Sequence, residues 1–202
     1  MLKKLCIASA ISTSAFITPI AMADIYSANS AESGFYLTAG IGTGLEHDID
    51  GSISGTDFSA TGRTTFAGGI GIGYDFDNPL RIETYVTRST AEVDSVTVGG
   101  TKYAVDESGS GTGYSVAVAY DFENDSKITP FISGSYGISW ADDADDSSNG
   151  YGIDFGLSTP MSDGMELWGS VGLSISPEET IDSVKYDGAT AWGFSTGLRI
   201  RL

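Results

Sequence analysis

The sequence is poor in cysteine, proline and positive charge, and each shortage excludes a class of protein. The single cysteine, Cys6, excludes a disulfide framework within the chain. Only 10 lysine and arginine residues stand against 27 aspartate and glutamate residues, so the net charge is −17. This acidic balance argues against nucleic acid as a partner and against electrostatic docking to anionic membrane surfaces. Few prolines and 27 glycines suit a chain of strands and turns.

Long apolar runs are also missing beyond residue 23, so no segment there predicts a membrane-spanning helix, which needs about 20 residues. Alternating strands would escape such a test, because their hydropathy averages to neutral. Residues 1–23 predict a secretory signal peptide, in which Lys3 and Lys4 precede an apolar stretch and Ala21-Met22-Ala23 forms a cleavage site. The alternative is an anchor helix that stays attached. We interpret 24–33 as a short periplasmic lead-in.

The last fifteen residues carry the pattern around which the chain is organised. Every second side chain is mostly apolar, and the side chains between them are only glycine, hydroxyl or arginine. A period of two predicts a strand. The apolar face is Trp192, Phe194, Thr196, Leu198, Ile200 and Leu202, and the opposite face is Gly193, Ser195, Gly197, Arg199 and Arg201. In water such a strand would be an aggregation hazard, so we expect lipid on its apolar side.

Similar alternation predicts seven earlier strands, joined by connections that are alternately long and short. The eight expected strands cover about 34–43, 63–76, 80–93, 110–122, 128–140, 150–159, 165–175 and 188–202. Antiparallel neighbours joined in this way place all long loops at one end, as in outer-membrane barrels. Because an open sheet edge does not span a bilayer, the last strand should pair with the first. The predicted fold class is all-β, a single eight-stranded antiparallel up-and-down transmembrane β-barrel over residues 34–202.

Charged residues follow the same alternation, and we expect none of them on the apolar faces. A charged side chain facing mid-membrane lipid costs about 2–4 kcal/mol, so the charges should line the lumen. The predicted lumen charge network is Asp75, Arg81, Glu83, Asp121, Asp154, Glu166, Arg199 and Arg201. We interpret it as a mutually paired polar plug, with a gate or proton path as the alternative. A soluble lipocalin-like barrel would reverse the two faces; the signal peptide and the loop asymmetry favour the membrane.

Eight such strands after a signal peptide resemble the small outer-membrane barrels of the opacity and outer-membrane-protein-A type, often called the porin family. The last eight residues look like that family's C-terminal insertion signal, with Ser195, Gly197, Ile200 and Leu202 at its defined positions. The resemblance implies a bacterial outer-membrane location. It also implies the outer-membrane assembly machinery, outer-membrane lipid and lipopolysaccharide as partners. It does not specify an activity, because this fold hosts many functions.

Two polar segments contain residue types that occur in catalytic or metal-binding sites. His47, the only histidine, lies near Asp48, Ser52 and Ser54, but sequence neighbours in a loop rarely form a catalytic triad, so we expect an exposed loop histidine. The acidic run 142–146 has oxygen donors suited to Ca²⁺ or Mg²⁺ without the spacing of a Ca²⁺-binding loop. We therefore predict no catalytic, metal-binding or cofactor-binding residue. Divalent ions bridging these loops to lipopolysaccharide phosphates remain a hypothesis.

The predicted function is an integral outer-membrane protein that is not an enzyme, supports the envelope and presents acidic loops for surface interaction. Three alternatives stay open at this point: a narrow solute channel or ligand-binding barrel, a lipid-A-modifying enzyme, and a soluble periplasmic barrel.

Overall fold

The computed structural model describes residues 33–142, 144, 146–181 and 183–202. The expected signal peptide and nearly all of the lead-in lie outside the described residues. No helix within these ranges is long and apolar enough to cross a membrane. The strands are β1 (Gly34–Gly44), β2 (His47–Ile53), β3 (Thr56–Asp75), β4 (Leu80–Val98), β5 (Thr101–Asp121), β6 (Thr129–Ala141), β7 (Ser147–Ser162), β8 (Met165–Ser176), β9 (Glu179–Ile181), β10 (Val184–Tyr186) and β11 (Ala189–Arg201).

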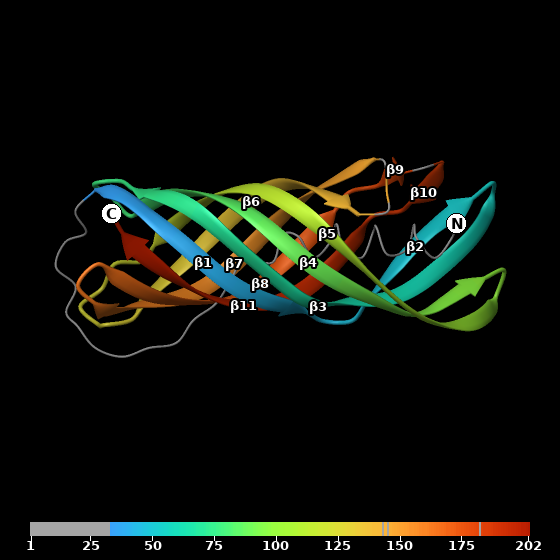
Figure 1. Ribbon diagram of the computed structural model, residues 1–202, viewed down its shortest axis with the longest axis horizontal. Coiled ribbons are helices and arrows are strands. Elements are labelled where there is room, and N and C mark those ends of the chain that lie inside the picture. The colour runs from blue at the N-terminus through green and yellow to red at the C-terminus, as the bar shows by residue number, and fades with distance from the viewer. Residues whose placement is uncertain (1–32, 143, 145, 182) are drawn as a thin grey trace.

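Eight long strands form a closed antiparallel ring, as predicted. β1 pairs on one side with β3 and on the other with β11, and β3 to β8 follow one another around the wall. Figure 1 shows the tilted strands wrapping around one axis, with the C-terminus at the end where the short turns lie. The last strand therefore closes the ring against the first, with Tyr36 opposite Arg201 and Gly44 opposite Gly193.

At the end away from the C-terminus the same sheet continues past the ring into a region that we call the crown. It consists of β2, β9, β10 and the ends of β3, β4 and β5 that face away from the C-terminus, and the two further views show it at one end only. The expectation of long irregular loops over 44–62, 94–109 and 176–187 is therefore wrong. The strands β4 and β5 run on to a two-residue turn at Gly99 and Gly100, both of which have positive φ, as the hairpin requires.

The ring is apolar outside and polar inside, which confirms the predicted orientation. Ile70 is 69% exposed and Val118 is 52% exposed, whereas Arg81 is 2% and Glu83 4% exposed. Large exposed apolar side chains come from every strand of the ring except β8, whose outward apolar side chains are half-buried. A soluble barrel with an apolar interior has the reverse arrangement, and this structure contradicts that alternative.

One expectation about the wall is wrong. Arg88 and Glu92 lie on the same outward face of β4 as Ile82 and Val86, although we expected no charge on an apolar face. They occupy the outer half of the strand, where the crown begins. The apolar band on β4 therefore ends at Val86.

The crown has its own apolar core. The buried members are Ile49, Phe58, Ala60, Ala91, Val93, Val96, Ile181, Val184 and Tyr186. The β9–β10 hairpin reaches this core because β10 pairs with β2. On β3, register shifts near Thr64 and Phe66 change which face points inward: Thr64 is buried and Phe66 is exposed. A bulge moves later side chains to the other face of a strand.

Candidate functional site: the charged lumen

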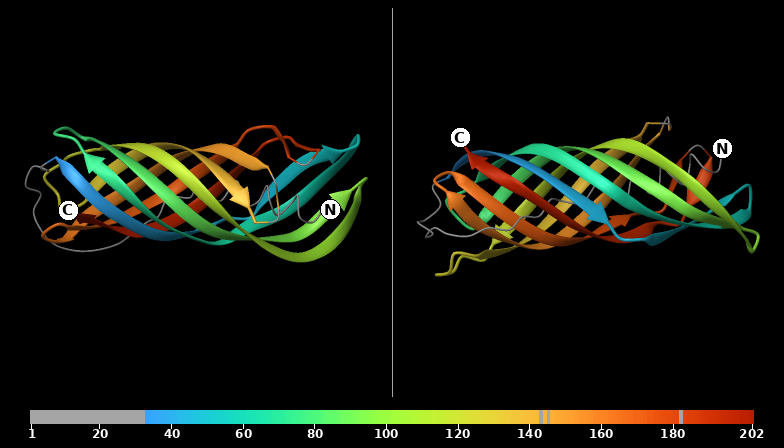
Figure 2. Two further views of the ribbon diagram at one scale, coloured as in Figure 1. Left: turned by 45° about the horizontal axis from the view of Figure 1, so that its top comes forward. Right: turned by 60° about the horizontal axis from the view of Figure 1, so that its bottom comes forward.

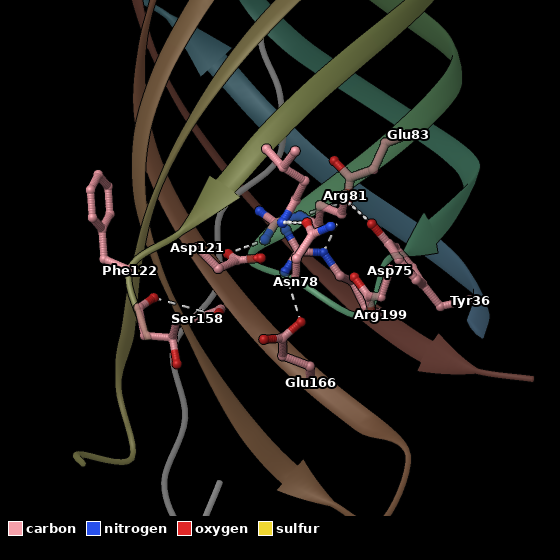
Figure 3. Close-up of polar contacts among 12 residues, drawn as sticks. Tyr36, Asp75, Asn78, Arg81, Glu83, Asp121, Phe122, Ser158, Glu166 and Arg199 are labelled. Atoms are coloured by element: carbon pink, nitrogen blue, oxygen red, sulfur yellow. Dashed lines mark hydrogen bonds and ion pairs between the residues drawn. The ribbon is translucent and has the colours of Figure 1, made fainter. Parts of the chain in front are cut away.

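Glu83 is the centre of a buried polar network that crosses the lumen near the short turns (Figure 3). Tyr36 on β1 donates a hydrogen bond to Glu83 Oε1 over 2.6 Å, and Tyr85 donates to Oε2 over 3.0 Å. Arg199 Nε on β11 lies 3.1 Å from the same Oε1, and Arg81 Nε lies 3.5 Å from it. Two hydroxyls and two guanidinium groups therefore face one carboxylate, which offsets the cost of burying its charge.

The remaining pairs extend the network across further strands. Arg199 Nη1 donates to Glu166 Oε2 on β8 over 2.7 Å, and Arg81 pairs with Asp121 on β5. Arg201 Nη2 donates to Asp75 Oδ2 over 3.0 Å at the more exposed end. Seven of the eight predicted lumen charges are thus brought together, in one ion-pair cluster and a neighbouring pair.

The eighth predicted residue, Asp154 on β7, lies elsewhere on the lumen wall. It is 1% exposed, and the hydroxyls of Ser133 and Ser170 lie 3.4 Å from its carboxylate oxygens. Its place in the lumen agrees with the expectation, whereas these contacts are to serines rather than to arginines.

Aromatic rings pack around the two central arginines. The Arg81 guanidinium carbon lies 4.6 Å from the centre of the Phe131 ring, and that of Arg199 lies 4.8 Å from the Trp168 ring. A cation over an aromatic face is attracted by the ring quadrupole, most strongly where water is excluded. The rings also occupy lumen volume that the charged groups leave empty, so ion pairs and aromatic packing together fill this cross-section.

These aromatic members of the network were not among the residues predicted for it. Tyr36, Tyr85, Phe131 and Trp168 all lie on the inward face of their strands, so alternation alone would have placed them in the lumen. Inward glycines make room for them: a Cβ at Gly73 would overlap the Tyr36 ring, and one at Gly156 would overlap the Phe131 ring.

Among the residues of the expected insertion signal, Ser195 is buried in the lumen, whereas Ile200 and Leu202 are exposed on the outer side. The Leu202 N–H donates to the Phe35 carbonyl over 3.0 Å, so the last residue still takes part in ring closure. Recognition by assembly machinery stays a prediction.

His47 lies on β2 in the crown, not in an irregular loop. Its Nδ1 lies 3.3 Å from the Leu45 carbonyl, and its Nε2 is buried without a hydrogen-bond partner in the described part of the chain. Burial lowers the pKa of His47, which favours the neutral ring. The neighbouring Asp48 instead accepts a hydrogen bond from Thr61 over 2.9 Å. This geometry does not assemble a nucleophile, base and acid.

The acidic run is described only in part, because residues 143 and 145 lie outside the described residues. Asp142 forms a two-pronged pair with Arg88. Among the residues that the structure describes, no group of three or more potential ligands is arranged to hold a metal ion.

Comparison with known proteins identifies the family. A family profile described as "Outer membrane protein beta-barrel domain" matches residues 8–199. The chain belongs to this family. No curated protein matches the sequence.

Two solved structures support the same fold. Neisserial surface protein A (NspA) shares 20% identity, with 85% of this chain and all of that chain covered and a TM-score of 0.56. The outer membrane protein OprG from Pseudomonas aeruginosa shares 12% identity, with 84% and 97% covered and a TM-score of 0.53. At these identities the likeness concerns the fold alone.

In an outer-membrane barrel the short turns face the periplasm. The lumen network therefore lies toward the periplasmic mouth of this outer-membrane barrel, and the crown extends on the outer side. A hollow of about 380 Å³ at that mouth is lined by Asp75, Arg81, Asp121, Glu166, Arg201 and residues of the adjoining turns.

Proposed function

We propose that this chain is a non-enzymatic structural protein of the bacterial outer membrane, with a sealed lumen and an outer crown that meets surface partners. The observation that carries the proposal is the network around Glu83, which ties β1, β4, β5, β8 and β11 together across the lumen. An eight-stranded barrel has an interior that side chains can fill. Here ion pairs and aromatic rings fill it, which supports a role in envelope integrity rather than general diffusion.

The crown supports the surface-interaction part of the proposal. Its core is apolar, but its outward side chains are acidic: Glu46, Asp48, Asp50, Asp57, Asp94 and Asp187 are all exposed. Asp48, Asp50, Asp57 and Asp94 are held on hydrogen-bonded strands of the crown, and Glu46 and Asp187 lie in the connections beside them. An ordered acidic surface on the outer side suits a basic partner.

The structural role is tested in cells that lack this chain. We expect increased sensitivity to bile salts and to large antibiotics, restored by the wild-type chain. Planar bilayers containing the purified protein should show no steady conductance at neutral pH. Unchanged sensitivity together with open-channel conductance would overturn the proposal.

A narrow solute channel is the second candidate, and one observation favours it. Away from the network the lumen is lined by small hydroxyl side chains, and Ser135, Ser139 and Ser176 have buried hydroxyls without a partner in the described part of the chain. Such a surface suits water or a small polar solute. Conductance that appears on replacing Glu83 by alanine, with wild type silent, would show that the network closes a path that otherwise exists.

The absence of catalysis and the role of the C-terminus are proposals with separate tests. His47→Ala should leave the acyl composition of lipid A unaltered, because the described contacts of the His47 ring include no serine hydroxyl.

For the insertion signal at Ser195, Gly197, Ile200 and Leu202, deletion of Leu202 should slow appearance of the heat-modifiable folded form in the outer membrane. Leu202→Phe, which keeps a large apolar side chain at the last position, should not slow it.

A further inference from the structure

A shallow apolar groove of about 500 Å³ crosses the outer wall of the barrel over β11, β1, β3 and β4. The wall here consists of rows of cross-strand neighbours, defined by the strand register. One row is Leu198, Ala39, Ile70 and Val86, and the row on its periplasmic side is Ile200, Leu37, Ile72 and Thr84. Ala39 and Thr84 are short side chains among branched ones. The hollow therefore follows from the sequence of the wall.

The next row toward the crown ends in a positive charge. It consists of Thr196, Ile41, Gly68 and Arg88. Gly68 has no side chain, and the Phe66 ring lies over this position: a Cβ there would be 3.2 Å from two of its ring carbons, so the surface beside Arg88 is apolar. Arg88 follows Val86 by two residues on the same face, a rise of about 7 Å along the strand. A cation thus stands at the outer end of an apolar groove.

Arg88 lies in the same cross-strand row as an exposed tryptophan. Across β5 and β6 its row continues through Thr112 to Trp140, which is exposed on the outer wall. Aromatic residues of this kind mark the boundary between hydrocarbon and headgroups. The Arg88 guanidinium therefore reaches the depth of lipid headgroups in the outer leaflet.

The partner that Arg88 has now can be displaced. Its guanidinium pairs with Asp142 and donates to Thr112 Oγ1 over 3.1 Å. Both side chains of the Arg88–Asp142 pair are about half exposed (54% and 50%), and exposed pairs contribute little to stability. A phosphate offers the same guanidinium a two-pronged acceptor of higher charge.

We propose that the groove and Arg88 form a binding site for the lipid A portion of lipopolysaccharide, with one acyl chain in the groove and a phosphate on Arg88. The apolar lining, the cation at its outer end and the location on the crown side of the wall together select a phosphorylated, acylated lipid of the outer leaflet. The inference rests on the proposed outer-membrane function, and it names a partner and a site for it.

Binding is measured by native mass spectrometry of the detergent-purified protein with added diphosphoryl lipid A and with its dephosphorylated form. Arg88→Gln should weaken diphosphoryl lipid A binding about tenfold, the scale of one charge-assisted contact, and leave the dephosphorylated form unaffected. Asp142→Asn should strengthen binding about threefold, because it frees Arg88. Ala39→Phe fills the groove with an apolar side chain and should weaken binding of both lipids.

Arg63→Gln is the matched control. Arg63 on β3 is also an exposed arginine, and it pairs with Glu92 on β4. Glu92 lies four residues beyond Arg88 along β4, in the direction of the crown, so Arg63→Gln should leave binding unchanged. Equal binding by wild type and Arg88→Gln, or equal weakening by Arg63→Gln, would overturn the site. If the wild type self-associates without binding either lipid, and Ala39→Phe abolishes this self-association, the groove is instead a contact between two copies of the chain.

Folding of each variant is checked by heat-modifiability on a gel. A wild-type chain that folds and reaches the outer membrane but does not bind diphosphoryl lipid A removes the lipid A site alone. A wild-type chain that is not recovered with the outer membrane removes the proposed function as well.

Discussion

The barrel and the crown share β3, β4 and β5, and the apolar and polar faces are exchanged between the two parts. On β4, the inward face carries Glu83 in the barrel and Val93 in the crown, while the outward face carries Val86 in the barrel and Glu92 in the crown. Along β4 the alternation of inward and outward side chains continues without a break through this change. What differs is the medium outside: lipid around the barrel and water around the crown. The exchange on β4, between Val86 and Glu92, therefore marks the outer boundary of the membrane.

The same comparison explains how each part holds together. The barrel has a hydrocarbon exterior that offers no hydrophobic drive toward its interior, so ion pairs and buried hydroxyls occupy the lumen. The crown gains its stability in the usual way of soluble proteins, by removing apolar side chains from water. The same kind of substitution should therefore destabilise one part and have little effect on the other. The variants that test this expectation run from the largest change in stability to the smallest.

The largest effect is expected from Glu83→Ala. It leaves Arg199 and Arg81 buried with fewer counter-charges, and breaking a buried pair by removing one partner costs about 3–5 kcal/mol. Urea unfolding in lipid vesicles measures the loss. Glu92→Gln, on the same strand but in the exposed pair with Arg63, is the control and should change the unfolding free energy by less than about 1 kcal/mol. Equal losses for both variants would contradict the idea that the buried network stabilises the barrel.

Phe58→Ala should cost about 3 kcal/mol, but within the crown only. The Phe58 ring is 4% exposed and packs edge-on against Tyr186 at 5.9 Å between centroids. Limited proteolysis should then cut the crown, while the barrel keeps its heat-modifiable migration. Unfolding of the barrel at the same denaturant concentration as the crown would show that the two parts form one cooperative unit.

Ile70→Arg tests the lipid side of the comparison. The side chain faces the hydrocarbon near the middle of the part of β3 that pairs with β1, where an arginine costs about 2–4 kcal/mol. Asp94→Arg, exposed on the crown, is the matched control and should change the free energy of unfolding by about 0.5 kcal/mol or less. Unfolding in vesicles of matched thickness distinguishes them, and two equal values would place Ile70 outside the bilayer.

The smallest effect is a pH dependence of the crown. Burial lowers the pKa of His47 below its usual value of about 6.5, so the unfolded crown binds the proton more readily than the folded one. Crown stability is then complete above about pH 6.5 and decreases as the pH falls below it. Hydrogen exchange of β2 amides at pH 7.5 and 5.5 should show this decrease in wild type and lose it in His47→Gln.

Much of this architecture could be predicted from the sequence because the period of two survives in every barrel strand. The eight strands, their alternating connections and the inward direction of Arg81, Glu83 and Arg199 all follow from that period. The crown could not be predicted in the same way. The β3 register shifts near Thr64 reverse the alternation, and the outward polar residues of the crown have the composition of a loop.

Which charged side chains pair with one another in the lumen could not be predicted from the sequence either. Glu83 and Arg199 are separated by 116 positions, and only the ring places them on facing walls. Alternation gives the face on which a side chain lies, but not its height in the lumen or its partner. The same limit applies to Asp154, whose inward direction was predicted but whose serine contacts were not.

Pairing of the first strand with the last has a consequence for biogenesis. The N–H of Leu202 completes the seam with Phe35, so a chain that is still being translated cannot finish the cylinder. Contacts of such large sequence separation form slowly. The first and last strands therefore keep unpaired edges until the whole ring has been synthesised.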